Sequence, residues 1–82
     1  MSDWIAADYP YKVIQVKGTS GNADGLLEYI CEAEPGVVTS AATWRIRKLV
    51  YDSTGFNTQV IWANGNRFFN NIQDNYATYS YS

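Results

Sequence analysis

The residue types that most often carry catalysis are scarce in this chain of 82 residues. It contains no histidine, which removes the commonest general base and metal ligand. Its single cysteine, Cys31, allows neither an internal disulfide nor a zinc site built from several cysteines. A nucleophilic cysteine needs a base beside it. Because Cys31 has no histidine to pair with, we expect a buried and inert thiol.

Two pairs of acidic residues could in principle catalyse glycoside hydrolysis, which requires two carboxyl groups about 5–10 Å apart. The pairs are Glu28 with Glu32, and Asp52 with Asp74. On a regular strand, Glu28 and Glu32 would share a face but lie about 13 Å apart. We therefore interpret the acids as ordinary solvated groups, and the sequence predicts a protein that is not an enzyme.

Oxygen ligands for calcium could come from Asp24 beside Asn22, or from Asp74 among its neighbouring asparagines. No twelve-residue calcium-loop pattern surrounds them, so we interpret these residues as turn formers. The glycines at 18, 21 and 25 do not have the spacing of a phosphate-binding loop. The sequence thus predicts neither a metal nor a cofactor.

Aromatic residues make up 16% of the chain, nearly as much as the charged residues at 17%. Trp44, Trp62 and Tyr79 could form a stacking platform for a sugar. Alternatively, these rings fill the interior of a domain that has few leucines. We favour the core interpretation, and a glycan partner remains an alternative.

Tyrosine, tryptophan and arginine are the residue types enriched at interface hot spots. A subunit interface is predicted at Trp4, Ile5, Arg45, Arg47, Arg67, Tyr79 and Tyr81. The formal charge is −4 over residues 1–40 and +2 over residues 41–82. This difference fits either ordinary solvated faces or complementary surfaces for head-to-tail assembly.

The overall formal charge of −2 argues against general binding to nucleic acid, which requires a basic stripe. No apolar run approaches the roughly 20 residues of a membrane span. The sequence therefore predicts partners that are neither nucleic acid nor membrane.

These residues must be positioned by strands, because β-branched and aromatic residues dominate and helix formers are few. Strands are predicted at residues 11–16, 26–33, 43–51, 57–63 and 76–82, with a short edge strand or an extended linker at 37–42. The hydrophobic alternation slips after Lys48, which predicts a bulge or a strand that changes sheets. Turns are predicted at residues 52–55 and, as type I′, at Asn64-Gly65.

We expect residues 1–10 to form an N-terminal arm and residues 11–82 a single β domain. The predicted fold is all-β, a small antiparallel β-sandwich or half-open barrel of about 5 strands. One short helical turn is predicted near residues 68–73, where two phenylalanines and an isoleucine have helical spacing.

Four segments of the second half occur in a recognisable order. Trp44-Arg45-Ile46-Arg47-Lys48 is followed by Trp62-Ala63-Asn64-Gly65, by FNNIQDN at residues 69–75 and by ATYSYS at residues 77–82. This order, over about residues 43–82, resembles small structural proteins of tailed bacteriophage virions, with weaker similarity at residues 11–16. Gln73 stands where the family pattern has a tryptophan.

The resemblance implies a virion component without enzymatic activity, in the tail, neck or fibre-attachment region. It also implies assembly by contacts with other virion proteins and with copies of the chain itself, after synthesis in the host cytoplasm. Two alternatives remain: a small carbohydrate-binding β module that uses exposed aromatics, and a monomeric inhibitor of a host protein.

Overall fold

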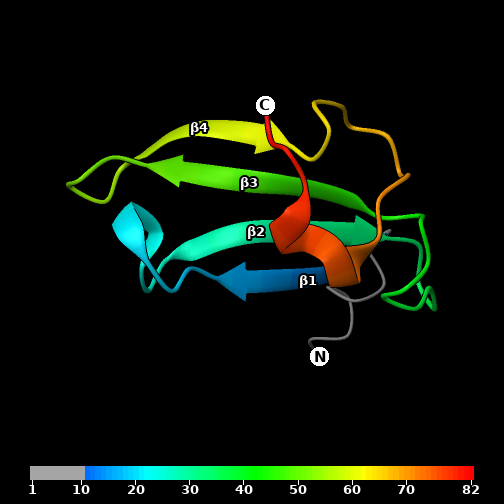
Figure 1. The fold of residues 1–82 in the computed structure, drawn as a ribbon. Helices are drawn as coiled ribbons and strands as arrows, with labels where there is room; N and C mark the ends of the chain where they lie inside the picture. Colours follow the sequence, from blue (N-terminus) through cyan, green and yellow to red (C-terminus); the bar gives the residue numbers. More distant parts are fainter. Residues whose placement is uncertain (1–10) are drawn as a thin grey trace.

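The computed structural model describes residues 11–82, and most of its regular structure is strand (Figure 1). Four antiparallel strands form one sheet in the order β1-β2-β3-β4. The strands are β1 Lys12–Lys17, β2 Leu27–Ala33, β3 Arg45–Tyr51 and β4 Asn57–Trp62. Two short 3-10 helices complete the chain, η1 Gly21–Ala23 and η2 Gln73–Thr78. The predicted all-β fold is confirmed.

Four of the predicted strands are present, but the fifth is not. The prediction of a strand at residues 76–82 is wrong, because η2 extends to Thr78 and only Tyr81 forms an isolated bridge, with Ala63. The helical turn expected near residues 68–73 lies at residues 73–78, and residues 37–42 form no strand. The spacing of three between Tyr76 and Tyr79 allows both rings to turn toward the core, and this spacing suits a 3-10 turn.

The two faces of the sheet carry different side chains, since cross-strand partners point to the same face. Ile14, Cys31 and Ile46 are successive partners across three strands. We call their side the covered face; it carries Ile14, Val16, Tyr29, Cys31, Ile46 and Lys48. We call the other side the open face; it carries Val13, Ile30, Glu32, Arg45, Arg47, Leu49, Val60 and Trp62.

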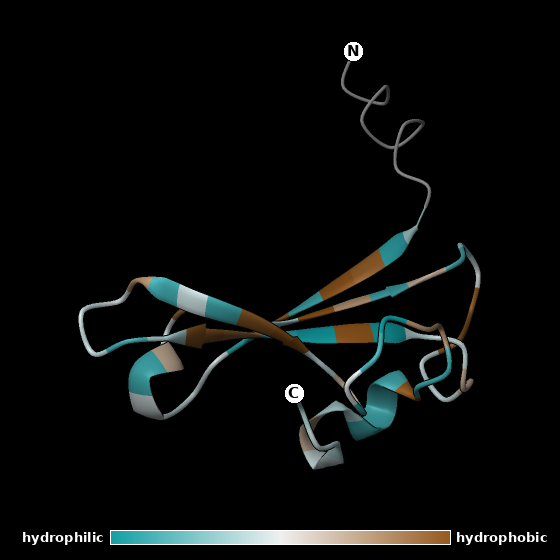
Figure 2. Ribbon diagram, turned by 90° about the horizontal axis from the view of Figure 1, so that it is seen from above, coloured by the Kyte–Doolittle hydropathy of each residue, from teal (hydrophilic) through white to brown (hydrophobic). Residues whose placement is uncertain are grey.

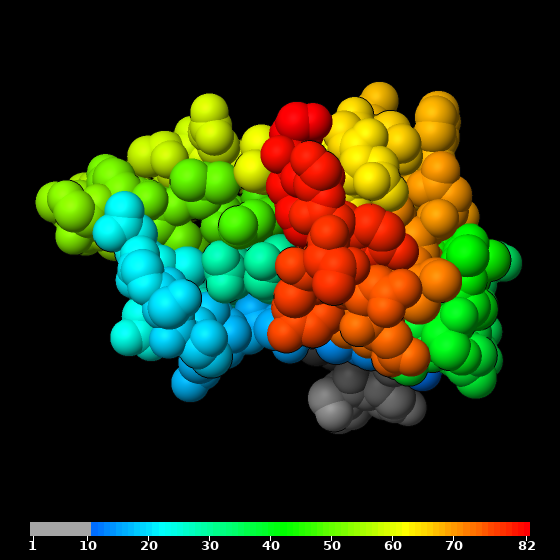
Figure 3. Space-filling view, viewed as in Figure 1, coloured from blue at the N-terminus to red at the C-terminus, as the bar shows by residue number. Residues whose placement is uncertain are grey.

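The covered face lies beneath the C-terminal segment. Figure 2 shows η1 and η2 on the same side of the sheet, and Figure 3 shows the C-terminal segment laid across its middle. The buried core is formed by Cys31, Ala33, Trp44, Ile46 and Ala63, and the rings of Tyr76, Tyr79 and Tyr81 pack against it. The C-terminal tyrosines thus stabilise the chain's own sheet.

Trp44 connects the C-terminal segment to the sheet. Its backbone N–H donates to Asn71 at 2.8 Å and its carbonyl accepts from Asn71 at 2.9 Å, while the indole Nε1 donates to the Val38 carbonyl at 3.0 Å. Its side chain is fully buried. One residue therefore joins β3 to the loop before it and to the segment after β4.

The end of the chain is fixed by hydrogen bonds. The Tyr79 hydroxyl accepts from the Ile72 N–H at 2.7 Å, and the Tyr81 hydroxyl donates to the Tyr76 carbonyl at 2.6 Å. Burial raises the pKa of the Tyr81 hydroxyl well above its ordinary value. Ser82 exchanges two backbone hydrogen bonds with Trp62, at 3.0 and 3.1 Å.

Both predicted turns are confirmed. Between β3 and β4, a carboxylate oxygen of Asp52 accepts hydrogen bonds from the Thr54 hydroxyl and from the N–H groups of Thr54 and Phe56. These bonds, led by that of the hydroxyl, lower the pKa of Asp52. After β4, Asn64 (φ 57°) and Gly65 (φ 72°) are both left-handed, as a type I′ turn requires.

The bulge expected after Lys48 in the third strand is not there: β3 alternates regularly up to Val50, and the extra residue, Thr58, lies in β4. The register between β3 and β4 shifts between Val50 and Tyr51, two residues beyond Lys48. A second register shift, at Val16 and Lys17, leaves Glu28 as an extra residue in β2. Each bulge increases the local twist and reverses the alternation of side chains beyond it.

Loss of the Trp44 side chain is expected to remove most of the fold's stability. We predict that Trp44→Ala lowers the free energy of unfolding by about 3–5 kcal/mol, an amount comparable to the whole stability of a small domain. Urea unfolding followed by circular dichroism would measure the loss. Phe68→Ala is the control, because Phe68 is 70% exposed and its removal should change stability by less than about 0.5 kcal/mol. A stable Trp44→Ala variant would show that the core lies elsewhere.

Candidate interaction surface

A carboxylate shared by two arginines lies on the open face. Glu32 is the cross-strand partner of Arg45, and Arg47 follows on the same side of β3. One oxygen, Oε1 of Glu32, accepts from Nε and Nη2 of Arg45 at 3.0 and 2.8 Å and from Nη1 of Arg47 at 3.2 Å. The Glu32 side chain is only 13% exposed. Two cations on one anion leave a net positive charge here.

Aromatic rings hold the guanidinium groups in place. The guanidinium carbon of Arg45 lies 4.7 Å from the ring centroid of Phe69, 5.3 Å from that of Tyr11 and 5.7 Å from that of Trp62. Arg47 lies 5.6 Å from the Trp62 centroid. Cation–π contacts of this kind are attractive, and they limit the freedom of long side chains. These contacts therefore restrict both arginine side chains to one arrangement.

A cavity adjoins this cluster. Tyr11, Phe69, Glu34 and Thr43 line a space of about 380 Å³, and the Tyr11 and Phe69 rings are 5.3 Å apart. Its volume is at the small end of the range for ligand pockets, about 300–1,000 Å³. Two aromatic walls, a carboxylate and a hydroxyl suit one planar or apolar group with a polar edge.

The rest of the open face is mostly apolar, with Gln15 as an exposed polar residue beside Ile30, and it is uncovered by the described chain. Val13, Ile30, Leu49, Val60 and Trp62 are all partly exposed, and Val60 reaches 47%. In Figure 2 no described segment lies over the middle of this face, while the helical segments occupy the opposite side. We call these five side chains the apolar strip; partly exposed apolar residues beside ordered arginines are typical of an interaction surface.

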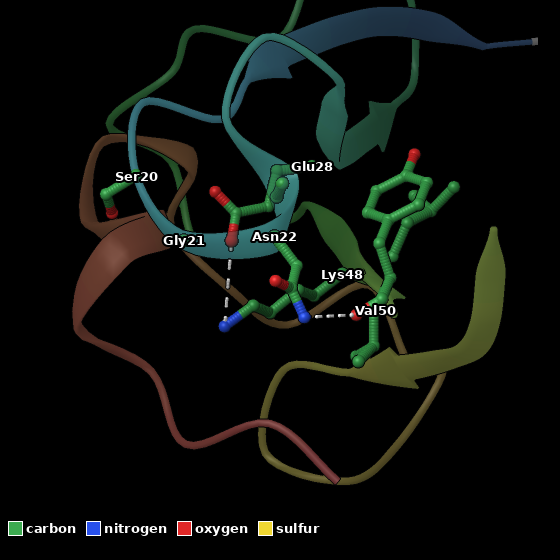
Figure 4. Close-up of a pocket in the computed structure, with 9 residues that line it drawn as sticks. Ser20, Gly21, Asn22, Glu28, Lys48 and Val50 are labelled. Atoms are coloured by element: carbon green, nitrogen blue, oxygen red, sulfur yellow. Dashed lines mark hydrogen bonds and ion pairs between the residues drawn. The ribbon is translucent and has the colours of Figure 1, made fainter. Parts of the chain in front are cut away.

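A second hollow lies on the covered face, between η1 and β3 (Figure 4). Its volume is about 280 Å³. Glu28 and Lys48 form an ion pair across it at 3.8 Å, and the Asn22 side chain donates to the Tyr51 carbonyl at 3.1 Å. These polar groups bind each other and fix η1 onto the sheet, so the hollow has a structural role.

The residues considered for catalysis are separated. We predicted that Glu28 and Glu32 share a face, and this is wrong. The bulge in β2 turns Glu28 toward Lys48 on the covered face, while Glu32 lies on the open face. Within residues 11–82, no group of three acidic or cysteine side chains could hold a metal ion.

Cys31 is fully buried, as expected. Burial raises the pKa of its thiol to about 11, although Gln73 Nε2 donates to Sγ at 3.8 Å and opposes the shift. At neutral pH the group is a protonated thiol inside the core. It therefore lacks the thiolate character that a nucleophile needs.

The residues predicted to form an interface do not form a single surface. Arg45 and Arg47 lie together on the open face, whereas Arg67 is exposed in the loop after β4. Tyr79 and Tyr81 lie on the opposite side of the sheet with their hydroxyls bonded internally. Residues Trp4 and Ile5 lie outside the described part of the chain.

Sequence reasoning missed the residues that organise the arginines. The sequence suggests for Glu32 only a catalytic role that we reject, and it indicates no site role for Tyr11 or Phe69. A usable signal was present: a strand with acids at 28 and 32 adjoins a strand with bases at 45, 47 and 48. Antiparallel pairing of two such strands favours opposite charges facing each other.

The sugar platform proposed from the sequence is not assembled. Trp44 is fully buried, and Tyr79 packs on the core, so neither presents a free ring. Of the three candidates, only Trp62 reaches the open face, where two arginines approach its ring. A sugar would have to use the Tyr11–Phe69 cavity.

Comparisons with protein-family models, with curated proteins and with solved structures find no match to this chain. Within residues 11–82, no helix is long and apolar enough to cross a membrane. The assignment of a role therefore depends on the geometry of the open face and on the segments named above.

Alkaline pH should weaken the fold through Cys31. The folded thiol keeps its proton until about pH 11, whereas the ordinary thiol loses it near 9.0. The contribution of the protonated thiol to the free energy of unfolding is fully present below pH 9. It decreases by about 2–3 kcal/mol as the pH rises to 11. Urea unfolding at intervals of pH would measure it. In the Cys31→Ala variant, the free energy of unfolding should fall less steeply between pH 9 and 10 than in the parent chain. An identical fall in both proteins would show that other groups cause it.

Removing the shared carboxylate should be more harmful than removing the whole ion pair. We predict that Glu32→Leu lowers the free energy of unfolding by about 2–4 kcal/mol, because two half-buried arginines lose their anion. The double variant Glu32→Leu with Arg45→Met should be more stable than Glu32→Leu alone. Chemical unfolding of the four members of this cycle would give the coupling. Additive effects would mean that the contact adds nothing to stability.

Proposed function

We propose that this chain is a non-enzymatic structural protein that binds other proteins through the open face of its sheet. The observation that carries the proposal is the ordered Glu32–Arg45–Arg47 group beside an uncovered apolar strip. Arginine and aromatic side chains supply most of the binding energy at many interfaces. Here they are already held by hydrogen bonds and rings, so binding costs less side-chain entropy.

A small domain also gains from such a partner. A chain of this length buries a modest share of its surface, and anything that binds only the folded state adds stability. The partly exposed Val13, Ile30, Leu49 and Val60 would leave water on binding. Assembly would thus complete a core that the described residues build on one side only.

The resemblance of residues 43–82 to structural proteins of tailed bacteriophages supports a more specific proposal. On that basis the chain is a virion component of the tail, neck or fibre-attachment region, and its partners are copies of itself and other virion proteins. Arg45, Arg47 and Lys48 of the second half pair with Glu32 and Glu28 of the first half within the chain, so the charge difference between the halves is largely neutralised inside the sheet.

A glycan-binding module is the second candidate, favoured by the cavity between Tyr11 and Phe69. Glu34 and Thr43 could accept hydrogen bonds from sugar hydroxyls while an aromatic wall contacts the ring. This function would leave the chain monomeric and would require neither the apolar strip nor the paired arginines. Oligosaccharides that quench tryptophan fluorescence at a one-to-one ratio would favour it.

Light scattering on a size-exclusion column tests the assembly proposal. We predict that the full chain forms oligomers whose mass rises with concentration, and that Val60→Asp weakens association at least tenfold by placing a charge on the apolar strip. Gln59→Asp is the matched control, because its side chain lies on the other face of the same strand. Equal loss in both variants would mean that the open face is not the contact.

The virion assignment has its own test. Quantitative mass spectrometry of purified particles that encode the chain should find it at a fixed number of copies per particle. Absence from particles, together with a monomer at every concentration, would overturn the proposal and favour the glycan module or the inhibitor.

A further inference from the structure

The first ten residues have a composition that complements the open face. Trp4, Ile5, Ala6 and Ala7 form an apolar run between Asp3 and Asp8, and the side chains of residues 1–10 include no base. These residues lie outside the described part of the chain, which begins at Tyr11. The argument therefore uses their chemistry and their point of attachment.

The open face offers a site for each part of this segment. Arg45 and Arg47 bind the Glu32 carboxylate through Nε and Nη2 of Arg45 and Nη1 of Arg47, so their other guanidinium N–H groups can donate to an acidic side chain, although Glu34 lines the adjoining cavity. The apolar strip that includes Ile30, Leu49 and Val60 suits an aliphatic residue. The cavity beside Phe69, of about 380 Å³, can admit one large ring.

We infer that the open face of one copy binds residues 1–9 of a second copy. Trp4 and Ile5 cover the apolar strip and its cavity, and Asp3 or Asp8 pairs with the arginines. This inference rests on the proposed assembly function and names the partner segment. The contact is head-to-tail, because the segment and the face are different surfaces.

A second copy is favoured over the chain's own segment by where that segment is attached. Tyr11 itself forms one wall of the cavity and contacts Arg45 and Phe69. Pro10 favours an extended conformation at the residue before it. To fill the same cavity, Trp4 would have to reverse direction within the few residues that remain. An extended segment of six or seven residues can reach about 20 Å, enough to meet a neighbouring molecule.

Mixing two defective full-length chains tests this directly. Trp4→Ala has an intact face and a defective segment, whereas Val60→Asp has an intact segment and a defective face. We expect each variant alone to associate at least tenfold more weakly than the parent chain. Mixed in equal amounts, they should form a one-to-one dimer, because one good segment meets one good face. Light scattering would give the mass.

Two controls separate the surfaces from general damage. Phe68→Ala removes an aromatic side chain that is 70% exposed and should assemble like the parent chain. Phe69→Ala removes a wall of the cavity and should behave like Val60→Asp in the mixing experiment. Circular dichroism of each variant would verify that the sheet is retained.

The outcomes distinguish the inference from the function on which it rests. If Val60→Asp dissociates the oligomer and Trp4→Ala does not, the open face binds something else and the inference is overturned, while the assembly function stands. If the two variants are each monomeric and remain so when mixed, head-to-tail binding is overturned. If the parent chain never associates, the proposal that copies of the chain assemble is itself overturned.

Discussion

A four-stranded sheet has two faces, and the described chain supplies a cover for one of them. The segment after β4 crosses the sheet and buries Cys31 and Ile46 beneath three tyrosine rings. Trp44 makes this possible, since its backbone pairs with Asn71 and its indole fills the space between the layers. The opposite face keeps its apolar and charged side chains near solvent. Core, chain end and interaction surface all follow from this one-sided coverage.

The shared carboxylate shows how an open face can carry charge without losing order. Burying Glu32 to 13% exposure costs hydration, and the two arginines offset that cost with short hydrogen bonds. The rings of Tyr11, Trp62 and Phe69 then shield the guanidinium groups on their other sides. A replacement by apolar residues could be as stable, so the ion pairs alone do not account for the cluster, and the assembly proposal gives it a role in recognition.

Sequence reasoning located the four strands because each combines β-branched residues with turn signals on both sides. The turns at Asn64-Gly65 and at Asp52 could be predicted from the chemistry of those residues alone. The conformation of the C-terminal segment was predicted wrongly. Its alternating tyrosines fit a strand, but packing of their rings on the buried core around Trp44, which is distant in the sequence, decides the conformation. The sequence could not predict that Glu28 and Glu32 lie on opposite faces of the sheet, because the bulge that reverses the alternation depends on pairing with β1. Likewise the meeting of Phe69 with Arg45 depends on tertiary packing, which no local pattern encodes.

The edges of the sheet indicate why assembly would use a face. On β1, Lys12 and Lys17 place charges at both ends of the outer strand, a common protection against edge pairing. On β4, Ser82 already occupies the backbone groups of Trp62, and a bulge near Tyr51 twists the far end. Both edges are thus blunted by different means. The open face has no comparable protection, because an exposed valine, Val60, and the partly exposed Ile30 and Leu49 lie on the same face as the ordered arginines. Guarded edges and a partly exposed apolar face together fit the proposal that copies assemble through this face.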